Sequence, residues 1–147
     1  MSPAPTLIRR PFHWGVVILV DAEWTGEGLL EPDPERLVTA NEQGAMVLVR
    51  HAQDTDEVEG EYLKFAEVDV HVRRLDAARD GEAGRREVYR GTIDLPSGTL
   101  NVGDADDEAL VPAHEGANIL VVRVEDTLPA DDLAPDAVWV DLLPKGA

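Results

Sequence analysis

The stretch from Arg86 to Asp126 constrains the fold more than any other part of the chain. It is built from short apolar segments separated by turns rich in Gly, Pro and Asp. Short segments of β-favouring residues between such turns predict a run of strands. We therefore expect the rest of the chain to pack against these strands. The strand-like segments are Glu87–Leu95, Thr99–Val102, Ala109–Val111 and Ala117–Val124.

Strand patterns also precede and follow this stretch. Phe12–Trp24 is apolar on both faces along most of its length, which predicts a central strand buried on both sides. Ala45–Arg50 is a second apolar segment. In Tyr62–Leu75, valines alternate with polar residues, and this period of two predicts a strand with one exposed face. Ala137–Leu143 supplies the last predicted strand.

One short helix is expected between the first two of these strands. Asp33 suits the N-cap position, and Pro34 suits the first helical position. Glu35–Asn41 then predicts the helix itself, and Gly44 provides its end.

These patterns predict a mainly β fold, an antiparallel β-sandwich of about eight short strands with one short helix. A partly open β-barrel is the alternative. Residues 1–11 contain three prolines and show no periodicity, so they predict a flexible N-terminal arm. Residues 12–147 are then expected to form a single β-sandwich domain.

The chain is strongly acidic. It carries 30 Asp and Glu residues against 13 Lys and Arg, for a net charge of −17. Direct binding to nucleic acid or to an anionic membrane is disfavoured, because phosphate binding needs a cationic face. Three interpretations stay open: solubility, a binding face for a basic protein, or the general composition of a salt-adapted organism.

Composition also restricts the location and the chemistry of the protein. The absence of cysteine excludes disulfides, thiolate zinc sites and a cysteine nucleophile. The longest apolar run, Gly15–Val20, is shorter than the roughly 18 residues of a transmembrane helix. Asp21 and Glu23 end it before it reaches the length of a signal peptide. We therefore expect a cytoplasmic protein.

Acidic residues after Gly103 raise a calcium-binding hypothesis. Asp104, Asp106 and Glu108 fall at positions 1, 3 and 5 of a twelve-residue loop, and Glu115 falls at position 12. However, alanine occupies the position where the EF-hand turn requires glycine, and a proline lies inside the loop. An EF-hand is therefore disfavoured, and a calcium site of another type is kept as an alternative.

Catalytic groups are scarce. Ser97 lies in a Pro-Ser-Gly turn and not in a nucleophile elbow. Asp21 and Glu23 are two residues apart, but such a pair is expected by chance in so acidic a chain. The four histidines show no metal-ligand spacing. We therefore expect no enzymatic activity, no cofactor and no metal.

The candidate partner-binding residues are one aromatic residue and two acidic loops. Trp24 follows a carboxylate at a predicted strand end, and such a tryptophan suits a binding hot spot. The acidic loops suit a basic protein. The candidates are Trp24, Asp54, Asp56, Glu57, Glu59, Asp104, Asp106, Asp107 and Glu108.

Seven features follow one another in a distinctive order along the chain. They are Val16–Val20, Pro34–Val49, Glu67–Arg73, Leu95-Pro96-Ser97-Gly98, Gly103–Glu108, the strand after Glu115-Gly116, and Val138–Val140. This order resembles the bacterial nuclease inhibitors typified by competence protein J. The resemblance covers most of the chain, and no single motif carries it. It implies an acidic protein that holds a basic, DNA-degrading nuclease by occupying its phosphate-binding face. No binding residue can be transferred from the family.

These observations lead to one main functional expectation and two alternatives. The main one is an acidic binding protein that inhibits or neutralises a basic protein, with a nuclease as the favoured partner. The alternatives are a β-sandwich module for structure or self-assembly, and a calcium-binding domain. The oligomeric state does not follow from the sequence.

Overall fold

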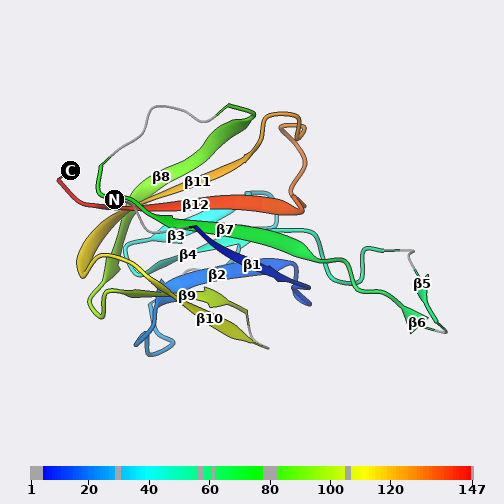
Figure 1. Cartoon of the computed structure of the whole chain (residues 1–147), viewed down its shortest axis with the longest axis horizontal. Coiled ribbons are helices and arrows are strands. Elements are labelled where there is room, and N and C mark those ends of the chain that lie inside the picture. Colours follow the sequence, from blue (N-terminus) through cyan, green and yellow to red (C-terminus); the bar gives the residue numbers. More distant parts are fainter. Residues whose placement is uncertain are drawn as a thin grey trace.

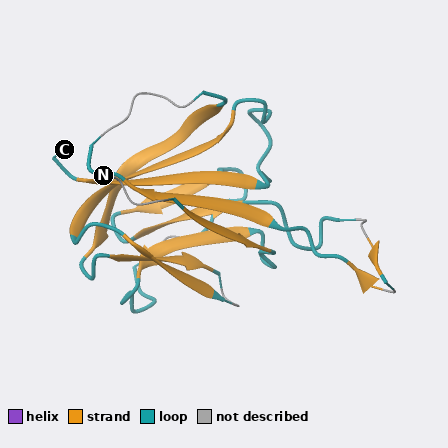
Figure 2. Ribbon diagram, viewed as in Figure 1, coloured by secondary structure: helices purple, strands orange, loops and turns teal. Residues whose placement is uncertain are grey.

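In the computed structural model, two β-sheets stack face to face (Figures 1 and 2). The structure describes residues 5–28, 31–55, 58–60, 62–77, 83–104 and 107–146. These residues form twelve strands and no helix. Consequently, none of them belongs to a helix that could cross a membrane.

The first sheet has the strand order β1-β7-β12-β11-β8. Its strands pair in antiparallel fashion except for β12 and β7, which are parallel. A register shift between Val122 and Arg123 marks a bulge in the β11–β8 pair. The bounds are Thr6–Arg10 for β1, Val68–Arg74 for β7, Ala137–Pro144 for β12, Gly116–Glu125 for β11 and Arg85–Leu95 for β8.

The second sheet has the strand order β10-β9-β2-β4-β3 and is antiparallel throughout. A separate two-stranded sheet, formed by β5 (Val58–Glu59) and β6 (Tyr62–Leu63), projects from the sandwich (Figure 1). The bounds are Glu108–Pro112 for β10, Thr99–Gly103 for β9, Val16–Asp21 for β2, Gly44–Leu48 for β4 and Val38–Asn41 for β3.

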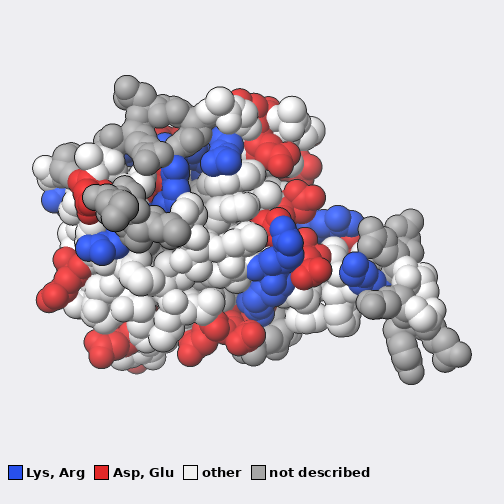
Figure 3. All heavy atoms as spheres, in the orientation of Figure 1, with Lys and Arg blue, Asp and Glu red and all other residues white. Residues whose placement is uncertain are grey.

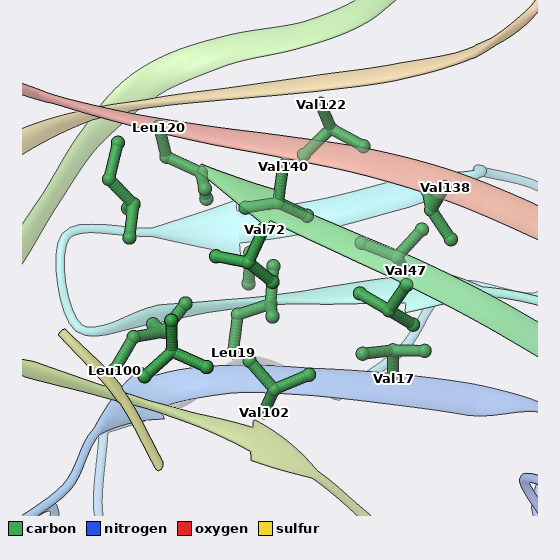
Figure 4. Close-up of a cluster of buried hydrophobic side chains, with 14 of the residues drawn as sticks. Val17, Leu19, Val47, Val72, Leu100, Val102, Leu120, Val122, Val138 and Val140 are labelled. Carbon is green, nitrogen blue, oxygen red and sulfur yellow. The ribbon is translucent and has the colours of Figure 1, made fainter. Parts of the chain in front are cut away.

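Branched aliphatic side chains fill the space between the two sheets (Figure 4). Val17 and Leu19 of β2 are fully buried there, as are Val138 and Val140 of β12. Every second residue of a strand points inward, so the sequence alternation fixes which side chains enter the core. In β7, the valines at positions 68, 70 and 72 are buried while the polar residues between them are not, as the sequence predicted. The predicted β-sandwich is confirmed.

The predicted helix at Glu35–Asn41 is wrong. Asp33 does accept a hydrogen bond from the Glu35 amide (2.9 Å), but the chain makes only a turn there. Val38–Asn41 instead forms β3 and pairs with β4. Asn41 Oδ1 accepts the amide of Gln43 (2.9 Å), which closes the hairpin between these strands. The neighbouring strand therefore outweighs the local helix signal.

Part of the segment expected to be a flexible arm lies against the first sheet. Residues 6–10 form β1, an edge strand that pairs with β7. Arg9 makes two hydrogen bonds to Asp69 of β7, at 2.6 and 3.0 Å. Arg10 makes an ion pair with Asp104 (2.8 Å). The backbone ladder and these two ion pairs tie the segment to the sandwich.

A buried carboxylate lies on the outer side of the first sheet. Asp141 of β12 accepts two hydrogen bonds from Arg73 of β7, each 2.8 Å long. It also accepts one from Arg123 of β11. Its side chain is only 2% exposed, so this carboxylate neutralises guanidinium groups that are themselves poorly hydrated.

Replacing Asp141 with alanine is expected to destabilise the protein by about 3–5 kcal/mol, because Arg73 and Arg123 lose their shared buried counter-charge. Urea unfolding measures the change. Glu125→Ala removes an exposed carboxylate at the end of β11 and serves as the control. Equal losses in the two variants would contradict the role given to Asp141.

The Arg9–Asp69 pair makes the stability of the β1 edge depend on pH. The Arg9 hydrogen bond lowers the pKa of Asp69 below its ordinary value. A carboxyl group with a lower pKa in the folded than in the unfolded state stabilises the fold at pH values above its unfolded-state pKa. This contribution is lost as the pH falls through the folded-state pKa. Arg9→Gln is therefore expected to unfold more easily than the wild type at neutral pH. Thermal unfolding curves should converge in acid, and a gap that persists there would exclude this origin.

Candidate functional site

Basic residues are concentrated in one sheet of the sandwich. The strands of the second sheet contain no Lys or Arg. In the first sheet, basic and acidic side chains adjoin, as Figure 3 shows over β1 and β7. Acidic side chains near the second sheet therefore have few nearby cations. The arginines in the strands of the first sheet are Arg9, Arg10, Arg73, Arg74, Arg85, Arg86, Arg90 and Arg123.

An acidic pocket of about 440 Å³ opens at one end of the second sheet. It lies where the end of β2, the β3–β4 turn and the β8–β9 turn meet. Four of its eight described lining residues are acidic, and none is basic. The lining residues are Asp21, Glu23, Trp24, Thr25, Glu42, Gln43, Asp94 and Pro96.

Asp21 connects the elements that form the pocket wall through hydrogen bonds. Its Oδ1 accepts hydrogen bonds from the Ser97 amide (3.0 Å) and the Ser97 hydroxyl (2.7 Å). Its Oδ2 accepts the Glu23 amide (2.9 Å). Asp21 is buried, and it joins the end of β2 to the β8–β9 turn. Gly98 completes that turn with a φ of 74°, a conformation that favours glycine.

The other three carboxylates of the pocket remain open. Glu23, Glu42 and Asp94 are exposed, and none forms an ion pair with a described residue. The Asp94 amide donates to the Glu42 carbonyl (2.7 Å), which holds β8 of the first sheet against the β3–β4 turn of the second. Three unbalanced negative charges around one hollow favour a guanidinium or ammonium group as the ligand.

Trp24 forms an aromatic wall of the same pocket. Its indole N–H donates to the Glu27 carbonyl (2.9 Å), and its amide donates to the Asp21 carbonyl (3.0 Å). The ring is therefore held in place while it lines the hollow. A fixed indole beside carboxylates suits a cation, because its face attracts positive charge. The structure thus places the predicted Trp24 next to Glu23, Glu42 and Asp94.

The second predicted acidic loop only partly presents open charge. The Asp104 side chain is 1% exposed and makes an ion pair with Arg10, so it does not offer a free carboxylate to a partner. Asp107 and Glu108 are exposed. Glu108 accepts a hydrogen bond from Asn101 Nδ2 (2.8 Å) across the β9–β10 pair. Asp106 lies outside the described residues.

The first predicted acidic loop does not line the pocket. Asp54 is exposed in the turn after His51, and its carbonyl accepts two hydrogen bonds from Arg50, at 2.7 and 3.0 Å. Asp56 and Glu57 lie outside the described residues. Glu59 falls in β5, but its side chain is likewise not described.

Sequence reasoning missed two of the four pocket carboxylates. Glu42 sits in the Asn41–Gly44 hairpin, where polar residues are a general turn signal and say nothing of binding. Asp94 precedes the Leu95-Pro96 turn by one residue, another position where acidic residues are common. Only the contact between β3 and β8, which are far apart in sequence, brings these two carboxylates together.

The side chains of Ser97, His13, His71 and His114 make structural contacts with residues other than the exposed carboxylates of the pocket. The Ser97 hydroxyl donates to Asp21, as described above. His13 contacts the edge of Phe65, and His114 Nε2 bonds the Leu75 carbonyl (2.7 Å). His71 stacks on Trp139 with ring centroids 5.0 Å apart, and burial lowers its pKa. Within the described part of the chain, no group of three or more His, Asp or Glu side chains could hold a metal ion.

Comparisons with known proteins identify the fold. No protein-family model and no curated protein sequence matches the chain. The crystal structure of ComJ from Bacillus subtilis, an inhibitor of the DNA-degrading activity of NucA, is similar over 97% of this chain and 96% of its own, with a TM-score of 0.54 and 11% identity. Crocagin biosynthetic gene J is similar over the same shares, with a TM-score of 0.53 and 14% identity. At such identities the likeness concerns the fold alone, and at that level it confirms the resemblance seen in the sequence.

The pocket contains a structural carboxylate, Asp21, and an exposed one, Glu42, and substitutions can distinguish their roles. Asp21→Ala is expected to cost about 1–3 kcal/mol, because the Ser97 and Glu23 donors lose their acceptor. Glu42→Gln changes the charge in the same pocket and is expected to alter stability by less than about 0.5 kcal/mol. Urea unfolding of both variants checks this difference, and a large loss for Glu42→Gln would refute it.

Proposed function

We propose that this chain is an acidic binding protein that holds and neutralises a basic protein, with a DNA-degrading nuclease as the favoured partner. The observation that carries the proposal is the pocket in which Glu23, Glu42 and Asp94 stand open beside Trp24. A side chain of the partner that carries a positive charge would gain three nearby carboxylates and one aromatic face. The pocket would lose its unbalanced charge in the same step.

The choice of a nuclease rests on charge complementarity and on the fold. An enzyme that degrades DNA must hold phosphates, and phosphates are held by a cationic face. An acidic protein bound to that face would exclude the DNA and so inhibit the enzyme. ComJ, which shares this fold, inhibits such an activity in Bacillus subtilis. Binding in this mode requires no catalytic group and no cofactor in this chain.

Net charge supports the kinetics of such an encounter. A charge of −17 attracts a cationic partner over several ångströms and speeds association at low salt. The strands of the second sheet hold no cation that would repel the partner at the pocket. We propose a cytoplasmic location for this interaction.

The first test joins recovery of the partner to its activity. The immobilised protein is incubated at low salt with lysate of its source organism, and the proteins eluted by high salt are assayed for DNA degradation. We expect a DNA-degrading protein that is inhibited when the purified chain is added back. An eluate without DNA-degrading activity would argue against a nuclease as partner.

The pocket itself is tested by a matched pair of variants. Glu23→Gln, Glu42→Gln and Asp94→Asn together are expected to weaken binding of the recovered partner by on the order of tenfold or more at low salt. They should also reduce its dependence on salt. The control changes as many exposed carboxylates elsewhere, as Glu125→Gln, Asp126→Asn and Asp136→Asn. Equal weakening in both triple variants would show that net charge matters and the pocket does not.

A further inference from the structure

We propose that the binding surface continues from the acidic pocket along the outer face of β2 to an apolar hollow at Trp14. The partner would place an exposed apolar side chain in this hollow while its basic side chain enters the pocket. This inference rests on the function proposed above and specifies the chemistry of the partner. The apolar hollow adds a second, uncharged contact to the interface. Charge alone would not distinguish one basic partner from another.

The apolar hollow has a volume of about 310 Å³. Trp14 forms one wall and is 65% exposed, which is unusual for the largest apolar side chain in a soluble protein. Tryptophan residues exposed beside a hollow are typical of binding hot spots. The remaining lining residues are Val16, Ile18, Pro32, Met46 and Asp104.

A smaller hollow joins this site to the acidic pocket. Its volume is about 100 Å³. It shares Trp24 with the acidic pocket, and it shares Ile18 and Asp104 with the apolar hollow. Val20 of β2 also lines it. The three hollows therefore adjoin one another along β2 through shared lining residues, and together they make up the proposed groove.

The register of the second sheet explains why this groove is open. Ile18 lies opposite Met46 on one side and opposite Gly103 on the other. Gly103 has no side chain to cover its neighbours. A Cβ at Gly103 would come within 2.5 Å of the Asp107 carbonyl, so a larger residue does not fit there without movement of the chain. The position beside Ile18 in the middle of the groove is therefore left without a side chain.

Charge decides between a different protein and a second copy of this chain as the occupant. Two copies that met through this groove would each present the same acidic surface, in which Glu23 and Glu42 are exposed. Like charges in one interface disfavour that contact. The strands below the groove hold no Lys or Arg that could compensate. A partner with one apolar and one basic side chain satisfies both ends of the groove.

The groove also sets the spacing of those two side chains. Val16 lines the apolar hollow, and Val20 lines the small hollow that reaches the acidic pocket at Trp24. Four steps along a strand span about 13 Å at roughly 3.3 Å per residue, and the acidic pocket lies beyond Val20. The partner should therefore present its apolar and basic side chains more than about 13 Å apart, as in an extended segment with about five residues from one to the other.

The decisive experiment measures binding of the nuclease recovered above to Trp14→Ala. We expect affinity to fall by at least about tenfold while the salt dependence stays that of the wild type. Leu7→Ala is the matched control, because Leu7 is a 47% exposed apolar residue on β1 of the opposite sheet. Neither change should alter the melting temperature. Wild-type affinity in Trp14→Ala, with weaker binding in the pocket triple variant, would overturn the groove and leave the pocket standing.

A second measurement needs no natural partner. Two synthetic peptides of equal composition carry one Leu and one Arg, either about five positions apart or adjacent. In ¹⁵N-labelled protein, the spaced peptide should shift the indole signals of Trp14 and Trp24 and leave that of Trp139, on the opposite sheet, unchanged. The adjacent peptide should shift only one of the first two. A shift of Trp24 alone with both peptides would overturn the groove, and no shift of either would count against the pocket as well.

Light scattering of the free protein tests the alternative occupant. A monomer at high concentration supports a different protein as partner. A dimer that dissociates on Trp14→Ala would overturn that choice and assign the groove to a second copy of this chain.

Discussion

Face-to-face packing of the two sheets determines where every outward side chain lies. Val17 and Leu19 are held in the core, and a strand turns successive residues to opposite faces. Val16, Ile18 and Val20 are therefore placed on the outer face of β2. A slip of one residue in the register would exchange the two sets and bury the wrong one. The apolar core thus fixes the outer groove, although none of its own side chains takes part in it.

Charged side chains are arranged differently in the two sheets. In the first sheet, arginines and carboxylates meet in pairs and clusters, as at Asp141 with Arg73 and Arg123, and their charges largely cancel. Near the second sheet, the carboxylates at the Trp24 pocket lack such partners. The exposed carboxylates of this pocket therefore keep their negative charge beside the ring of Trp24.

The sequence was sufficient where one face of a strand is buried and the other is not. The alternating valines of β7 and the position of Trp24 at the end of β2 followed from local pattern. The helix at Glu35–Asn41 failed because its capping residue also serves a turn, and pairing with β4 then decided the backbone. The sequence pattern placed Arg10 in a flexible arm and Asp104 in an exposed loop, so their ion pair could not be predicted. Glu42 and Asp94 lie in one site only through a contact between strands distant in sequence, which a local pattern cannot reveal.

The order in which the strands are made has a consequence for how this molecule matures. All strands of the second sheet are complete once Pro112 has been synthesised. The first sheet stays divided until β12 enters between β7 and β11, because β12 is the last described strand and takes the central position. Until then, the two strands expose unpaired edges, which are prone to join other chains. The second sheet can therefore form early during synthesis, whereas the edges of β7 and β11 are covered only after β12 has been made.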